Sequence, residues 1–109
     1  MNTRDDKIRR GSANVFADLG YSDPDTHLLK AQLVTRIDEI ISHRKLTQVQ
    51  AAEIMEISQP DVSRLLKGQF RDVSVERIMR LLTRLGCKVD IVIKRPGTRV
   101  HSVIHVESA

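Results

Sequence analysis

A short polar stretch near the middle of the sequence carries the side chains with the most distinctive chemistry. Gln59 and Arg64 each present a planar group with paired hydrogen-bonding atoms, and Ser63 lies between them. A Gln amide matches N6 and N7 of adenine, and an Arg guanidinium matches O6 and N7 of guanine. Lys67 and Arg71 follow as positive charges. Such side chains can bind base edges and phosphates, and the alternative is that Arg64 and Lys67 belong to an ordinary solvated face.

The sequence shows no comparable grouping for catalysis or metal binding. His101 and His105 have a four-residue spacing that chelates a metal on a helix, but their segment is predicted to be a strand, so we interpret them as solvent-exposed. Cys87 is the only cysteine, which excludes an internal disulfide and an all-cysteine metal site, and we interpret it as a small core residue. Phosphate-loop and nucleophile motifs are missing. We expect no enzyme activity, no cofactor and no metal.

The composition favours one folded, basic domain. The chain has 109 residues, of which 40% are hydrophobic and 29% charged, as in globular proteins. Its net charge of +4 weakly favours a polyanionic partner. Apolar runs are too short to span a membrane, and the charged N-terminus does not lead into an apolar signal region. We therefore expect a cytoplasmic protein without membrane contact.

Apolar residues recur at helical spacing in two long segments that should form a framework. Asp23 and Pro24 predict the start of the first helix, because Asp caps free N–H groups and Pro suits the first turn; it continues to about His43. Ser74 is predicted to cap the second long helix, which runs to Gly86. Their apolar stripes comprise Leu29, Leu33, Ile37, Ile40 and Ile41 in the first, and Val75, Ile78, Leu81, Leu82 and Leu85 in the second.

Two short helices joined by a tight turn are predicted between these segments. Thr47 and Gln50 form a capping box, Ser58 with Asp61 repeats the start signal, and Gly68 suits a left-handed helix end. The inward side chains are Ala51, Ala52, Ile54 and Met55 in one helix and Val62, Leu65 and Leu66 in the other. The polar residues Gln59, Ser63, Arg64 and Lys67 would then face outward.

After Gly86 the pattern changes from helical to extended. Residues 89–94 are rich in β-branched side chains, 95–98 carry a turn signal, and 100–106 can form a second strand. An isolated hairpin is only marginally stable, so these strands need a partner. The prediction is a C-terminal β-strand or hairpin that pairs with a second chain.

A two-fold axis at Val92 would give that pairing a favourable register. Asp90 would face the partner's Lys94, and Ile91 would face the partner's Ile93. An axis at Ile91 would instead oppose Lys88 and Lys94, two like charges. The predicted dimer seam comprises Val89, Asp90, Ile91, Val92, Ile93 and Lys94.

The motif TQVQAAEIMEISQPDVSRLLKG resembles the helix-turn-helix of the Cro/lambda-repressor superfamily, often called XRE-type regulators. Around it, GSANVFADLGYSDPD, KAQL and LLTRLG resemble HigA-like antitoxins. The resemblance implies a mainly α fold with an N-terminal arm at 1–22, a DNA-binding domain at 23–86 and a β-forming dimerisation segment at 87–109. Glu56 departs from the pattern, because this turn position usually holds Gly; a left-handed Glu costs about 1 kcal/mol more.

The resemblance also implies how DNA would be bound. The helix after Ser58 would lie in the major groove, with Gln59, Pro60, Ser63 and Arg64 at the base edges. Pro60 stands where many relatives hold a polar residue and can at most touch a thymine methyl. Phosphates would be held by Thr47, Gln48, Ser58, Lys67 and Arg71, partly at helix N-termini that favour anions. Gln48 and Ser58 would also serve as capping residues in a bundle that binds nothing.

The implied function is that of a homodimeric repressor that binds a palindromic operator and, as an antitoxin, neutralises a RelE/HigB-like ribonuclease toxin. The arm through Leu19 is a candidate toxin-binding segment, although packing on the first helix explains its apolar residues equally well. A free-standing repressor is the first alternative. A protein-interaction or RNA-associated module is the second, and Gln59, Arg64 and Lys67 argue against it.

Overall fold

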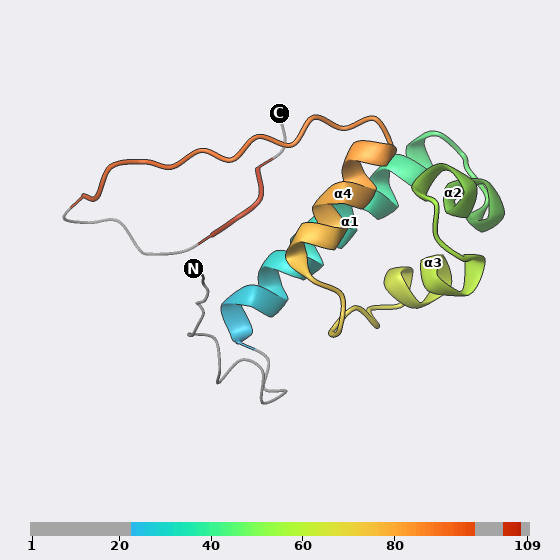
Figure 1. Ribbon diagram of the computed structural model, residues 1–109, viewed down its shortest axis with the longest axis horizontal. Coiled ribbons are helices and arrows are strands. Elements are labelled where there is room, and N and C mark those ends of the chain that lie inside the picture. Colours follow the sequence, from blue (N-terminus) through green and yellow to red (C-terminus); the bar gives the residue numbers. More distant parts are fainter. Residues whose placement is uncertain (1–22, 98–103, 108–109) are drawn as a thin grey trace.

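Four α-helices make up the fold in the part of the chain that the computed structural model describes, residues 23–97 and 104–107. They are α1 (Pro24–His43), α2 (Gln48–Met55), α3 (Gln59–Leu66) and α4 (Val75–Arg84). Figure 1 shows α1 and α4 side by side, with α2 and α3 grouped at one end of this pair. The predicted helices and their order are confirmed, whereas the arm at 1–22 lies outside the described residues.

The helices begin where the sequence supplies side-chain caps. Both capping-box bonds are present at α2: Thr47 Oγ1 accepts from the Gln50 N–H at 3.0 Å, and Gln50 Oε1 accepts from the Thr47 N–H at 2.8 Å. The Ser58 and Ser74 hydroxyls accept backbone N–H groups of α3 and α4, each at 3.1 Å. Local chemistry therefore sets the helix starts, as predicted.

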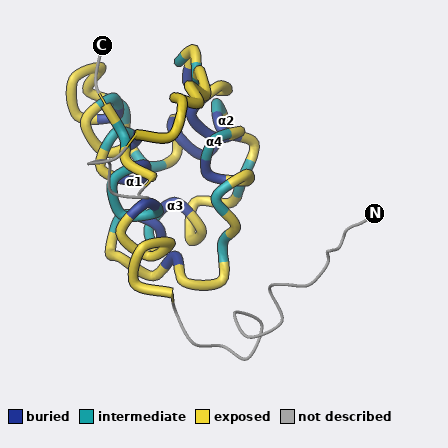
Figure 2. The backbone as a smooth tube through the Cα atoms, turned by 90° about the vertical axis from the view of Figure 1, so that its left-hand side faces the viewer, coloured by how far each residue is buried: buried dark blue, intermediate teal, exposed yellow. Residues whose placement is uncertain are grey.

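One apolar core joins all four helices. Ile37, Met55, Val62 and Ile78 have no exposed surface, and Figure 2 shows buried stretches on the inner sides of the helices. Ile40, Ile54 and Leu66, which were predicted to face inward, are half-buried at the edge of the core. The remaining core side chains are Leu29, Leu33, Val34, Ile41, Ala51, Ala52, Leu65, Phe70, Leu81, Leu82 and Leu85.

The connection between α2 and α3 contains only residues 56–58. Glu56 adopts the left-handed conformation, with φ of 61° and ψ of 41°, which confirms the expectation for this position. Gly68 likewise has a positive φ of 89° just after α3. These two positions end the short helices and turn the chain sharply on either side of α3.

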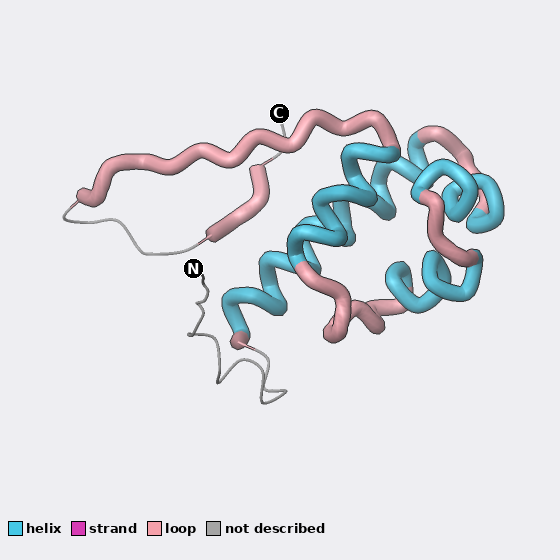
Figure 3. Tube along the Cα trace, viewed as in Figure 1, coloured by secondary structure: helices cyan, strands magenta, loops and turns pink. Residues whose placement is uncertain are grey.

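The segment after α4 is extended but forms no strand within the described residues, and Figure 3 shows it as loop. The predicted β-strand at 89–94 is thus not confirmed, and residues 98–103 of the hairpin lie outside the description. Among residues 23–97 and 104–107 no strand pairs with 89–94, so no ladder forms there. Cys87, Val89 and Val106 pack at the edge of the core, and the Val106 N–H donates to Gln32 Oε1 at 3.1 Å.

We predict that Glu56→Gly stabilises the protein. Glycine adopts a positive φ without the steric cost that Glu56 bears, and the exposed Glu56 carboxylate loses only a 3.9 Å contact with Arg84. The free energy of unfolding in urea should rise by about 1 kcal/mol. The control Glu53→Gly, inside α2, should lower it by about 1 kcal/mol. A loss of stability in both variants would contradict the argument.

Candidate nucleic-acid interface

The outer face of α3 gathers the residues that were predicted to contact bases. Val62 and Leu65 are buried against the core, so the 3.6-residue period turns Pro60, Ser63 and Lys67 to the opposite side. Gln59 and Arg64 flank them. Ser63 is half-buried and the other four are exposed. The structure therefore brings the predicted base-contacting side chains together on one accessible face.

A side-chain hydrogen bond joins the first turns of α2 and α3. Gln59 Nε2 donates to Gln48 Oε1 at 2.6 Å. A Gln amide has two N–H donors and one carbonyl acceptor, so Gln59 keeps one donor and its acceptor for another partner. Adenine needs that same pair, a donor to N7 and an acceptor from N6. The bond with Gln48 thus orients Gln59 without using up the atoms that would bind a base.

Arg64 forms an ion pair with Asp61, one turn earlier on the same helix. The hydrogen bond from Arg64, followed by that from the Ser58 hydroxyl, lowers the pKa of Asp61 below its ordinary value of 3.8. Like other carboxyl groups with an ordinary or lowered pKa, Asp61 is ionised at neutral pH. It was predicted only as part of a cap; its three-residue spacing from Arg64 was the available signal for this pair.

The turn between α2 and α3 is held from α4. Arg84 Nη1 donates to the carbonyl oxygen of Met55 at 3.0 Å, and Arg84 Nη2 lies 3.9 Å from Glu56 Oε1. Arg44, just after α1, donates to the carbonyl of Leu85 at 3.1 Å. Neither arginine was predicted to have this role, because the acceptors are backbone carbonyls far away along the chain. Arg84 thus ties α4 to the end of α2, and Arg44 ties the end of α1 to the end of α4.

The predicted phosphate contacts lie at the starts of α2 and α3 and just after α3. Thr47 and Gln48 belong to the start of α2 and Ser58 caps α3, where unpaired N–H groups favour an anion. Lys67 ends α3 and Arg71 follows it; both are exposed. The Arg71 carbonyl accepts from Lys30 Nζ at 2.9 Å, which links the segment after α3 to α1. Phosphate contact by these five residues stays a prediction.

Comparison with known proteins agrees with this geometry. Residues 15–94 match the family model described as "Helix-turn-helix domain". A solved structure named "Putative XRE Family Transcriptional Regulator" is 36% identical, with a TM-score of 0.75, and the match covers 81% of this chain and 100% of that one. The chain belongs to the XRE family of helix-turn-helix proteins. No curated protein matches it.

In this XRE-family chain, the motif's two helices are α2 and α3. The HigA-like subgroup is not distinguished by these matches, which establish the broader family. The match reaches past α4 into the extended segment, so the family resemblance includes residues that were predicted to form the dimer seam.

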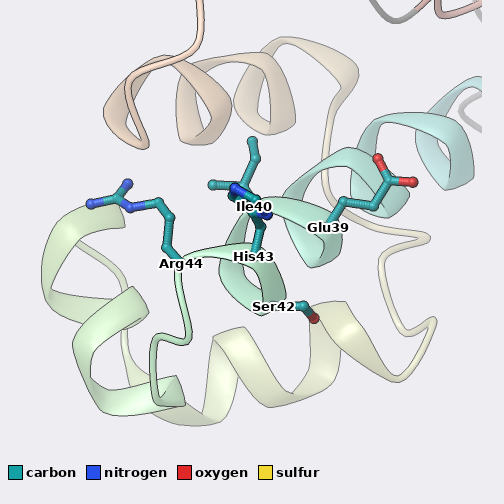
Figure 4. A pocket seen from close by; sticks show the side chains of 5 residues that line it. All are labelled: Glu39, Ile40, Ser42, His43 and Arg44. Atoms are coloured by element: carbon teal, nitrogen blue, oxygen red, sulfur yellow. The ribbon is translucent and has the colours of Figure 1, made fainter.

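The described surface of the XRE-family chain also has a shallow hollow at the C-terminal end of α1. Figure 4 shows its lining, with Glu39 and Arg44 pointing in opposite directions. His105 is exposed and lies 3.2 Å from Glu107, whereas His101 is outside the described residues. Over the described ranges, no group of three His, Cys, Asp or Glu residues is placed to hold a metal. Nor is any described helix both long and apolar enough to cross a membrane.

Proposed function

We propose that this XRE-family chain is a sequence-specific DNA-binding transcriptional repressor. The observation that carries the proposal is the outer face of α3, where Gln59 is oriented by Gln48 and retains a donor and an acceptor that match adenine. The related structure named as a transcriptional regulator supports the same function. In this proposal α3 enters the major groove.

The side chains of α3 would divide the work of binding. Gln59 and Arg64 read bases, and each contributes about 1–3 kcal/mol of discrimination. Ser63 reaches a base or a phosphate, and Pro60 contributes at most a contact with a thymine methyl. The phosphate-binding set is Thr47, Gln48, Ser58, Lys67 and Arg71, which fixes the position of the protein without reading sequence.

We also propose a homodimer that binds a palindromic operator. One short recognition helix reads few bases, and two copies of α3 about 34 Å apart would read two half-sites. The extended segment projects from the helices in Figure 1, with Ile91 74% and Ile93 90% exposed. Val92, between them, is likewise 74% exposed, so this part of the segment presents a run of apolar side chains to solvent. Such an apolar edge favours pairing with a second copy.

The antitoxin role is part of the proposal and has a separate basis. It is supported by the resemblance of GSANVFADLGYSDPD, KAQL and LLTRLG to HigA-like antitoxins. In this role the dimer represses its own operon and binds a RelE/HigB-like toxin. A free-standing repressor is the outcome if the toxin is missing.

Substitutions on α3 test the DNA proposal. Binding is measured on the duplex upstream of the protein's own gene and on a scrambled duplex of equal length. Gln59→Ala and Arg64→Ala should each reduce the ratio of the two affinities about tenfold or more. Lys67→Ala should weaken binding to both duplexes alike, and the salt dependence of binding should indicate about one phosphate contact fewer. Gln69→Ala removes an exposed amide just beyond α3 and serves as the control. Uniform weakening in all the α3 variants would refute the assignment.

Charge reversal in the seam tests the dimer. Asp90→Lys would oppose the partner's Lys94 at two symmetry-related places and should raise the dimer dissociation constant about tenfold. The double variant Asp90→Lys/Lys94→Asp restores opposite charges and should restore wild-type association. Sedimentation equilibrium measures both. A monomeric wild type at micromolar concentration, or a double variant no better than the single one, would contradict the seam.

Purification from the native operon tests the antitoxin role. A small, basic RelE-like protein encoded beside this gene should co-purify with the tagged, full-length chain. Adding purified chain should then block RNA cleavage by that protein in proportion to the amount added. If no such protein is encoded there or none binds, the free-standing repressor replaces the antitoxin.

A further inference from the structure

We propose that Asp61 determines specificity by keeping Arg64 in a charge-neutral pair on α3, which disfavours phosphate contacts on DNA that lacks the matching bases. The inference rests on the proposed DNA-binding function and adds a residue that was not among the predicted base or phosphate contacts. It starts from the ion pair between the two side chains on the exposed side of α3.

The pair is built into one helix and is open to a ligand. Asp61 and Arg64 are separated by three residues, so both project from the same side of α3, with side chains 50% and 56% exposed. The Ser58 hydroxyl accepts from the Asp61 N–H at 3.1 Å, which fixes the backbone that bears the carboxylate. Neither group is withdrawn into the core, so DNA approaching α3 would meet both.

The charges of Asp61 and Arg64 determine how this pair would interact with DNA phosphates. An arginine without a counter-ion binds any phosphate, and such binding is independent of sequence and sensitive to salt. The Asp61 carboxylate neutralises Arg64 and is itself repelled by phosphates. This arrangement weakens binding to arbitrary DNA, because the guanidinium must leave its partner or bring a negative charge toward the backbone.

Matching bases would remove that disadvantage. A guanidinium has five N–H donors, and the bond from Arg64 Nη2 to Asp61 leaves others for O6 and N7 of guanine. The Asp61 carboxylate accepts hydrogen bonds only, so its complement on DNA is an amino group, N4 of cytosine or N6 of adenine. The inferred recognition element is therefore a guanine beside a base that presents an amino group in the major groove.

The test compares Asp61→Asn with the wild-type dimer on the operator and scrambled duplexes. The variant keeps the shape of the side chain and removes one negative charge. Affinity for the scrambled duplex should rise, and the salt dependence of that binding should indicate about one additional phosphate contact. Operator affinity should rise less or fall, so the ratio of the two affinities should drop about tenfold, a change equal to about 1.4 kcal/mol.

Glu39→Gln is the matched control. Glu39 pairs with Arg36 at 2.8 Å with the same three-residue separation, but on α1, so the variant makes the same charge change elsewhere. It should leave the affinity ratio unchanged. An equal drop in both variants would show that net charge is responsible and would overturn the role of Asp61.

The remaining outcomes separate the inference from the function on which it rests. An unchanged ratio in Asp61→Asn, or equal weakening on both duplexes with a lower melting temperature, would overturn the specificity role and leave the repressor function standing. A wild-type protein that does not prefer the operator would refute the proposed function, and the inference with it.

Discussion

The three-residue connection between α2 and α3 is the constraint on which the rest of the structure depends. It works only because Glu56 adopts a left-handed conformation, and Arg84 holds the turn by donating to the Met55 carbonyl at 3.0 Å. Ala51 and Ala52 are buried and small, so α2 lets neighbouring helices approach closely. The turn therefore fixes where α3 lies against α2, and the apolar side chains of α3 select the side that is buried.

Core packing and the candidate interface are two sides of the same short helix. Val62 and Leu65 anchor α3 in the core, and this burial presents Gln59 and Arg64 outward. Both outward groups then have partners within the protein, Gln48 and Asp61. These partners restrict side-chain motion before any ligand arrives, which reduces the entropy lost on binding. In the proposed function, base recognition thus depends on pairs of side chains more than on single residues.

The C-terminal segment shows the opposite situation, because its residues favour a strand but no described part of the chain pairs with it. Its β-branched residues favour a strand, yet a strand is stabilised by a neighbour that pairs with its backbone. Arg44 ties the end of α4 to α1 through the Leu85 carbonyl, so the segment starts from a fixed point on the core. In our proposal this anchored start sets the distance between the two α3 helices of a dimer.

The sequence by itself determined the helices, their caps and the composition of the α3 face. Thr47, Ser58 and Ser74 act on N–H groups within their own first turn, and apolar periodicity selects the buried side, so neighbouring residues contain this information. Gly86 and the β-branched residues after it marked the end of the helical part in the same way.

Only the tertiary structure decided how these elements meet. Two hydrogen bonds join residues of different elements, from Gln59 to Gln48 and from Arg84 to the Met55 carbonyl. Phe70, in the loop after α3, is buried in the shared core. The pair of Asp61 and Arg64 was visible as a spacing, but whether its members meet depends on side-chain rotamers that a sequence does not specify. The physical reason is that local hydrogen bonds depend on neighbours in the chain, whereas these contacts depend on how the core brings distant segments together.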